Sequence, residues 1–231
     1  MNRLSRFIRA SRFKKRHDVL NYLIRTRGYR DYLEIGVNKG RCMSRVHCEH
    51  KTGVDPQPIV EPNGWTLHRE TSDEFFAHNQ DRFDLVFVDG LHLARNALAD
   101  ILNGLATLRD GGMVLAHDCN PASEPAQRPD PDLARFGGWH GDVWKAIAYV
   151  RSRVPAAFCR TLDLDKGVAV TLPLDPNGVP RWSNELHEEA RRFFDSVSWT
   201  DLDRDRSEVL GLIGGRVELE RELSHVAAGC C

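Results

Sequence analysis

The sequence lacks any run of about 20 uninterrupted apolar residues, which is the length that a membrane-spanning helix needs. It also lacks an apolar stretch near its N-terminus of the kind that forms the core of a secretory signal. These two absences predict a cytoplasmic protein without a membrane span. The content of 41% hydrophobic and 28% charged residues over 231 positions is typical of a globular protein with a large core.

Cysteines in the paired C-x-x-C spacing of structural zinc sites are missing as well. The six cysteines are scattered, and the last two, Cys230 and Cys231, form a loose terminal pair. The nearest approach to a zinc site is a set of four side chains on a predicted helix, Cys42, His47, Cys48 and His50. Without the paired spacing, reduced thiols are the better interpretation.

Net charge is also close to zero, at −1, but it is unevenly distributed. The first 30 residues contain ten Lys or Arg and one acidic residue, which leaves 22 basic and 32 acidic residues in the remainder. Helical spacing of apolar residues predicts a basic amphipathic helix over residues 2–15. It could contact an anionic membrane surface, nucleic acid or an acidic substrate, or be a solvated helix or a contact in the homodimer that we expect. The acidic remainder makes a nucleic-acid partner the less favoured of these.

From residue 31 onward, short apolar runs alternate with amphipathic stretches, which is typical of a parallel sheet covered by helices on both faces. Strands are predicted at 31–37, 52–55, 66–70, 83–88, 113–117, 158–163 and 167–172. Helices are predicted at 18–27, 40–49, 72–79, 94–108, 142–153, 184–194 and 201–212. The pattern predicts an α/β, doubly wound, Rossmann-like fold with a seven-stranded, mostly parallel sheet that ends in an antiparallel hairpin. We expect a basic extension over 1–30, a core over 31–175 and a helical extension with a tail over 176–231.

The first strand runs into a glycine-marked turn in the segment Y-L-E-I-G-V-N-K-G, residues 32–40. Gly36 and Gly40 let the backbone approach a ligand closely and permit positive φ. Glu34 would repel a pyrophosphate but attract a sulfonium nucleoside that carries an ammonium group. The G-x-x-x-G spacing also differs from the G-x-G-x-x-G of nicotinamide enzymes, although such an oxidoreductase stays the alternative enzyme class.

Acidic and hydroxyl side chains follow the next two strands. Asp55 ends the second strand, where an acid accepts hydrogen bonds from both ribose hydroxyls of a dinucleotide or of S-adenosylmethionine. Ser72 and Asp73 open the helix after the third strand. Either could bind the adenine amino group, and helix capping explains them equally well.

The fourth and fifth strands each deliver a carboxylate and an imidazole to the same edge of the sheet, as D-G-L-H and H-D-C-N-P. Two mechanisms fit these residues. His92 or His117 could take the proton from a substrate hydroxyl that attacks a methyl group. Alternatively, Asp89 and Asp118, with His117, could hold Mg²⁺ that lowers the pKa of the attacked oxygen. We favour a histidine base, because a histidine is unusual beside a hard ion.

A long loop, 119–139, follows the fifth strand and contains four prolines. At its end, Trp139 and His140 lie where a substrate would be flanked, and Asp142 is placed as the N-cap of the next helix.

Taken together, these motifs resemble a bacterial family of small class I S-adenosylmethionine-dependent methyltransferases, related to macrolide-sugar and cephalosporin-type O-methyltransferases. The matching pieces, in the order of that family, are Y-L-E-I-G-V-N-K-G, G-V-D-P, T-S-D-E-F-F, F-D-L-V-F-V-D-G-L-H, G-G-M-V-L-A-H-D-C-N-P and G-D-V-W-K-A. They cover residues 31 to 172. The first motif is common to the superfamily, and the D-G-L-H and H-D-C-N-P pair is more specific.

The resemblance implies S-adenosylmethionine bound through Glu34, Gly36, Asp55 and the Ser72–Asp73 turn. It places the chemistry near Asp89, His92, His117 and Asp118. In the metal-dependent relatives an acidic or amide pair ends the fifth strand, and His117 replaces one member here, so both mechanisms stay open. We therefore expect transfer of a methyl group to a hydroxyl of a small molecule, sugar or glycan. The non-enzymatic alternative is a methyltransferase-like domain that binds a partner.

Overall fold

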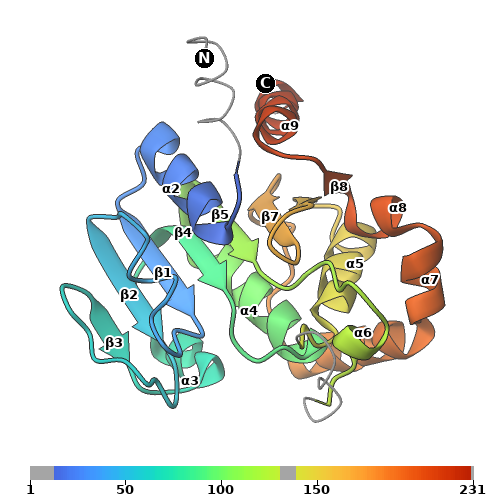
Figure 1. Ribbon diagram of the computed structural model, residues 1–231, viewed down its shortest axis with the longest axis horizontal. Coiled ribbons are helices and arrows are strands. Elements are labelled where there is room, and N and C mark those ends of the chain that lie inside the picture. Colours follow the sequence, from blue (N-terminus) through green and yellow to red (C-terminus); the bar gives the residue numbers. More distant parts are fainter. Residues whose placement is uncertain (1–12, 131–138, 230–231) are drawn as a thin grey trace, which may run out of the picture.

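The computed structural model describes residues 13–130 and 139–229, and most of the predicted basic helix over 2–15 lies outside these ranges. The chain forms a sheet of eight strands in the order β3-β2-β1-β4-β5-β7-β6-β8 (Figure 1). The strands are β1 Asp31–Ile35, β2 His50–Val54, β3 Thr66–His68, β4 Phe83–Val88, β5 Leu108–Ala116, β6 Ala157–Leu162, β7 Val168–Pro173 and β8 Leu212–Ile213. Among them, β7 alone runs antiparallel to its neighbours β5 and β6. The mostly parallel α/β sheet is confirmed.

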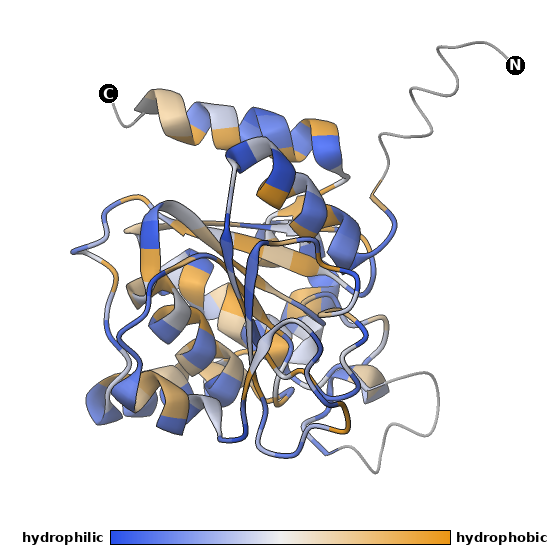
Figure 2. Ribbon diagram, turned by 90° about the vertical axis from the view of Figure 1, so that its left-hand side faces the viewer, coloured by the Kyte–Doolittle hydropathy of each residue, from blue (hydrophilic) through white to orange (hydrophobic). Residues whose placement is uncertain are grey.

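Helices cover both faces of this sheet. They are α2 Arg16–Arg27, α3 Ser72–His78, α4 Ala94–Ala106, α5 Val143–Arg153, α6 Asn184–Ser196, α7 Trp199–Arg204, α8 Arg206–Leu210 and α9 Arg216–Gly229, with a 3-10 turn η1 at Pro125–Gln127. One core cluster joins the sheet to α3 through α8, and a second joins the other face to α2 and α9. Figure 2 shows the apolar sheet between these two layers. No helix among the described residues is both long and apolar enough to cross a membrane.

Alternation of side chains along the central strands explains the two cores. In β4, Val86 and Val88 pack in the cluster on the α4 face, whereas Leu85 and Phe87 pack in the cluster on the α2 face. Successive side chains of a strand point to opposite faces, so a strand covered on both faces is apolar throughout.

Two predicted helices were wrong, and the prediction of seven strands was wrong by one. Residues 41–45 form only turns, because Asn21 bonds the backbone of Arg45 and His47 (2.8 Å each) and Lys51 Nζ bonds the carbonyl of Met43 (3.0 Å). These tertiary bonds replace the ladder of a longer helix. The four zinc candidates on this segment do not form a metal-binding group among the described side chains.

The predicted helix over 201–212 divides into α7, α8 and β8. Gly211, in the left-handed region at φ +57°, ends α8 and turns the chain back to the sheet. The pair Leu212–Ile213 then adds parallel to β6, so the antiparallel hairpin of β6 and β7 is not the edge of the sheet. The helix α9, which follows, was not predicted from the sequence.

Candidate active site

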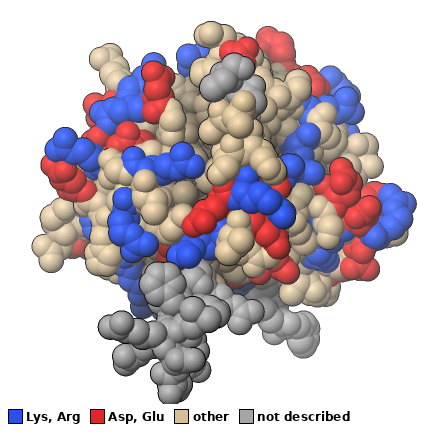
Figure 3. Space-filling view, turned by 90° about the horizontal axis from the view of Figure 1, so that it is seen from above, with Lys and Arg blue, Asp and Glu red and all other residues tan. Residues whose placement is uncertain are grey.

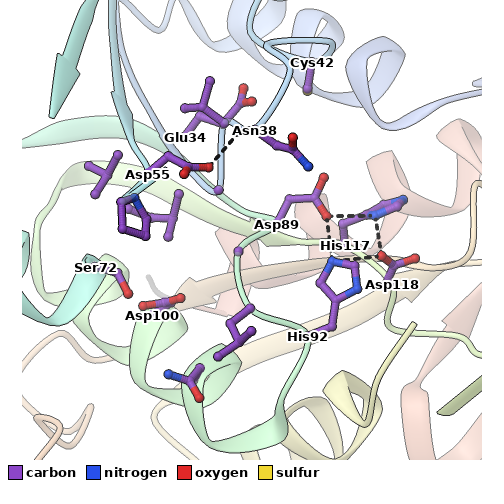
Figure 4. Close-up of a pocket in the computed structure, with 18 of the residues that line it drawn as sticks. Glu34, Asn38, Cys42, Asp55, Ser72, Asp89, His92, Asp100, His117 and Asp118 are labelled. Carbon is purple, nitrogen blue, oxygen red and sulfur yellow. Dashed lines mark hydrogen bonds and ion pairs between the residues drawn. The ribbon is translucent and has the colours of Figure 1, made fainter. Parts of the chain in front are cut away.

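A cavity of about 750 Å³ opens at the carboxyl ends of the parallel strands (Figure 4). The strand order reverses between β2-β1 and β4-β5, and ligands of open α/β sheets bind at such a switch point. The register pairs Ile35 with both Val54 and Val88, and Val88 with Ala116. The residues that directly follow these four therefore leave the sheet side by side, at the same edge. Nine predicted site residues line the cavity, namely Glu34, Gly36, Asp55, Ser72, Asp89, His92, His117, Asp118 and Trp139.

Gly36 allows the exits of β1 and β4 to touch. Its φ is +87°, and a Cβ built there would lie 2.2 Å from the carbonyl oxygen of Asp89. Any larger residue would separate the two strands at the floor of the cavity.

Asp55 organises the turn after β1 from the end of β2. Its Oδ2 accepts the backbone N–H of Asn38 (2.7 Å) and its Oδ1 accepts that of Gln57 (2.8 Å). Asn38 has φ +47°, so this bond holds a turn that a non-glycine residue rarely adopts. Each carboxylate oxygen keeps a second lone pair for a ligand hydroxyl.

Glu34 lies deeper than its place in the motif suggested. Its side chain is 1% exposed and accepts a hydrogen bond from the Tyr32 hydroxyl (2.6 Å). Burial raises the pKa of Glu34 to about 8, although the bond from Tyr32 opposes that rise. A neutral acid and a carboxylate are therefore both accessible near neutral pH.

The ends of β4 and β5 are joined by an ion-paired cluster around His117. Its Nδ1 lies 3.1 Å from Asp89 Oδ1 and 3.2 Å from Asp118 Oδ2, and its Nε2 lies 2.6 Å from the carbonyl oxygen of Asp165. Burial by itself would lower the pKa of His117, but the neighbouring acids outweigh it and raise that pKa well above its ordinary value. His117 is only 3% exposed, so its imidazole and these acids interact away from solvent.

His92 occupies a more open position beside the same carboxylates. Its Nε2 lies 3.4 Å from Asp118 Oδ2 and 3.7 Å from Asp89 Oδ1 (Figure 4). Its ring stacks on Trp139, with centroids 4.9 Å apart and 26° between the planes. Asp118 has φ +58°, an uncommon conformation of the kind that clusters at functional sites.

One wall of the cavity was not predicted from the sequence. It is formed by Arg16, at the start of α2, and by Lys166, in the turn between β6 and β7. Asp165, in the turn between β6 and β7, accepts the backbone N–H of Arg16 (3.0 Å) and pairs with Lys15 Nζ (2.7 Å). These contacts place Arg16 against His117 (2.8 Å between Nη1 and Nδ1) and within 3.7 Å of Asp89. Lys166 lies 3.5 Å from Asp118. No local motif marked these side chains, because only the tertiary fold brings them together.

Asp100 was also missed, although the sequence carried a signal for it. Its side chain is 2% exposed and lines the cavity from α4. Burial raises its pKa to about 7. The signal that could have revealed it is an acidic residue among the apolar residues of A-L-A-D-I-L.

Several predictions about individual residues differ from the structure. Gly40, Asp73 and His140 are not among the described residues that line the cavity. Thr71 rather than Ser72 caps α3. Asp142 does not cap its own helix, since it accepts the backbone N–H of Ala94 (2.7 Å) at the start of α4.

Within the described part of the chain, one group of side chains has the spacing of a metal site, namely Asp89, His92 and Asp118. Its potential ligand atoms lie within 4.8 Å of one another. Among the described residues, Asp118 Oδ1 and His92 Nδ1 are buried without a hydrogen-bond partner, although Lys166 Nζ lies 3.5 Å from Asp118 Oδ1. Two carboxylates suit a divalent cation, so this set fits one, and its histidine is His92 rather than the His117 that the sequence suggested.

Residues 33–119 match the family model of a methyltransferase domain. The matched segment runs from β1 to the residue after Asp118. It therefore contains both the turn around Gly36 and the cluster of Asp89, His92, His117 and Asp118. A search of curated protein sequences finds no match to this chain.

Solved structures share the fold at low sequence identity. A methyltransferase from Podospora anserina with bound S-adenosylhomocysteine is 16% identical, with a TM-score of 0.53, over 68% of this chain and 77% of that chain. A putative caffeoyl-CoA O-methyltransferase from Staphylococcus aureus is also 16% identical, with a TM-score of 0.52, over 74% of this chain and 90% of that chain. These similarities confirm the Rossmann-like fold.

Proposed function

We propose that the protein is an S-adenosylmethionine-dependent methyltransferase that transfers the methyl group to a hydroxyl oxygen of a small molecule or sugar. The observation that carries this proposal is the single cavity that joins the turn around Gly36 and Asp55 to the cluster of Asp89, His92 and Asp118. The match to a methyltransferase domain over residues 33–119 supports it.

The cofactor would lie across the ends of β1 and β2. Asp55 is positioned to accept hydrogen bonds from the ribose hydroxyls while it holds the turn through Asn38. Glu34 supplies a buried negative charge, when ionised, for the ammonium group of the methionine part. Gly36 keeps the floor of the cavity open to a close backbone approach.

The general base in this proposal is His92 rather than His117. His117 is enclosed by Asp89, Asp118 and Asp165 and holds its proton tightly. His92 lines the cavity with a partly exposed side chain (21%), and its Nε2 faces the carboxylates. It takes the proton of the acceptor hydroxyl as that oxygen bonds to the methyl carbon and the carbon–sulfur bond breaks, which leaves S-adenosylhomocysteine.

Metal assistance is a second form of the same reaction, favoured by the spacing of Asp89, His92 and Asp118. A divalent cation bound there would lower the pKa of an acceptor hydroxyl. Thermal unfolding with Mg²⁺, with Mn²⁺ and with a chelator distinguishes the two forms. A rise in melting temperature with the cation, lost in Asp118→Asn, supports metal assistance, and full activity in the chelator excludes it.

The acceptor would contact Trp139, whose ring extends the surface of the His92 ring. Figure 3 shows Lys and Arg interspersed with Asp and Glu on the face seen from above, without an extended basic surface. The excess of acidic over basic residues after residue 30 favours a small acceptor over a nucleic acid.

Isothermal titration calorimetry with S-adenosylmethionine and S-adenosylhomocysteine tests the proposal. We expect binding of both, with the affinity lowered at least about tenfold in Asp55→Asn, because charged hydrogen bonds to the ribose are weakened. Asp110→Asn is the matched control, since Asp110 is exposed in the first half of β5 and does not line the cavity. Binding of NADH without any response to either sulfur nucleoside would instead support the oxidoreductase alternative.

A further inference from the structure

Asp100 is a buried acid that the reaction above does not use. It lies in α4, where its neighbours Leu98, Ala99 and Ile101 are buried in the core, and its own side chain is 2% exposed. Carboxylates are seldom buried to this extent unless another group satisfies them.

The protein satisfies only part of the Asp100 carboxyl. Ser72, the first residue of α3, donates a hydrogen bond to it. One of its oxygens, Oδ1, is buried and has no hydrogen-bond partner among the residues that the structure describes. An unsatisfied buried acceptor destabilises the folded state, and Asp100 lines the cavity, so its carboxyl is suited to a donor that arrives with a ligand.

The position of Asp100 indicates which part of a ligand would supply that donor. Asp100, Ser72 and Asn96 line the same cavity as Asp55. In Figure 4, Ser72 and Asp100 lie on the Asp55 side of the cavity, away from His117 and Asp118. If Asp55 binds the ribose, the methionine part extends toward Asp89 and the base extends toward Ser72 and Asp100.

The width of the cavity at this end is set by the backbone after β4. A Cβ built on Gly90 would lie 3.6 Å from Asp100 Oδ2, so Gly90 covers the acid closely.

We propose that Asp100 is a specificity-determining residue that accepts a hydrogen bond from the exocyclic amino group of the cofactor's adenine. This inference rests on the proposed function and extends it to the choice of base. A carboxylate accepts from the amino group of adenine, but it opposes the carbonyl oxygen that hypoxanthine has at the same position. The site would therefore select adenine nucleosides over inosine nucleosides.

The test compares S-adenosylhomocysteine with S-inosylhomocysteine by calorimetry, in the unmodified protein, in Asp100→Asn and in the control Asp110→Asn. We expect the unmodified protein and the control to prefer the adenine compound by at least about tenfold. Asp100→Asn should bring this ratio close to one, because an amide can donate to the hypoxanthine oxygen. An unchanged ratio in Asp100→Asn overturns the inference.

A second measurement does not depend on the folding of a variant. An analogue of S-adenosylhomocysteine with a dimethylated amino group has no N–H at this position, and we expect the unmodified protein to bind it at least about tenfold more weakly. Equal affinity would overturn the inference. If the unmodified protein does not bind S-adenosylhomocysteine at all, the proposed function fails, whereas tight binding without base selectivity refutes only the role of Asp100.

Discussion

The Nδ1 atom of His117 lies 3.1 Å from Oδ1 of Asp89, so an ion pair joins the carboxyl ends of the adjacent strands β4 and β5. The pair is nearly closed to solvent, since the side chain of His117 is 2% exposed and that of Asp89 is 16% exposed. His117 is therefore part of the framework that positions the acids, while His92 is left to face the cavity.

The two histidines should respond differently to the same substitution. His92→Gln should lower kcat by about 10²- to 10⁴-fold, as expected for loss of a general base, with little change in the affinity for S-adenosylhomocysteine. His117→Gln should lower the free energy of unfolding by about 3–5 kcal/mol, because it removes the ion-pair partner that lies nearest to Asp89 and Asp118. Denaturant unfolding and steady-state kinetics measure both effects.

His78→Gln is the control for these two variants, because His78 is exposed on α3, pairs with Glu70 and is not among the described residues that line the cavity. Its activity and stability should match the unmodified protein. If His92→Gln keeps full kcat, His92 is not the base.

Substitution at Gly36 tests whether the contact between β1 and β4 shapes the cavity. Gly36→Ala should destabilise the protein by at least about 3 kcal/mol, because its Cβ would overlap the carbonyl of Asp89 in addition to adopting positive φ. Gly64→Ala is a matched control: Gly64 also has positive φ (+72°), but nothing lies within 4 Å of its Cβ position. The control should lose only about 1–2 kcal/mol in denaturant unfolding. Equal losses would show that conformation alone, rather than the contact, requires glycine at position 36.

The sequence was sufficient to predict the central strands and the residues at their ends. Alternation in β4 and the glycine turn after β1 are local patterns, and parallel strands bring their carboxyl ends together wherever they occur. The helix expected over 40–49 was wrong for a reason that no local pattern carries, because Asn21 on α2 binds its backbone from outside. The two-residue strand β8 is too short to have a periodicity at all.

The site, too, contains some residues that local sequence patterns reveal and others that only tertiary contacts bring together. Asp55, Asp89 and Asp118 each follow the end of a predicted strand and could be recognised by that position. Arg16 and Lys166 come from the start of α2 and from the turn between β6 and β7, and only the closed fold places them beside the acids. Their contribution depends on contacts between residues about 150 positions apart, such as that of Lys15 with Asp165, which spacing along the chain does not reveal.

Cofactor binding should depend on pH through Glu34. Because burial raises the pKa of Glu34 to about 8 in the empty site, the carboxyl is mostly neutral at pH 6 and mostly ionised at pH 9. A cationic cofactor favours the ionised form, so the affinity for S-adenosylmethionine should rise between pH 6 and pH 8 with release of a proton. Glu34→Gln should remove the rise. Calorimetry in two buffers of different ionisation enthalpy measures the proton release, and identical pH dependence in both proteins would contradict this role of Glu34.

Asp100 makes a further prediction about stability without a ligand. The pKa of Asp100 is about 7 in the folded protein, above the ordinary value of about 3.9, so the folded state binds its proton more tightly than the unfolded state does. Its contribution to the free energy of unfolding is therefore greatest below about pH 4 and is lost as pH rises to about 7. Asp100→Asn has no such proton, so the stability of the unmodified protein relative to this variant should fall between pH 4 and pH 8 by on the order of a few kcal/mol.

Denaturant unfolding of both proteins at four or five pH values in this range measures that difference. Saturating S-adenosylhomocysteine should reduce the slope, because an amino group near Oδ1 favours the ionised carboxyl and lowers its pKa toward the ordinary value. Parallel stability curves for Asp100→Asn and the unmodified protein would mean that Asp100 has the same proton affinity in both states. Burial would then have no effect on the ionisation of the Asp100 carboxyl. There would be no reason to expect that the carboxyl needs a hydrogen-bond donor from the ligand.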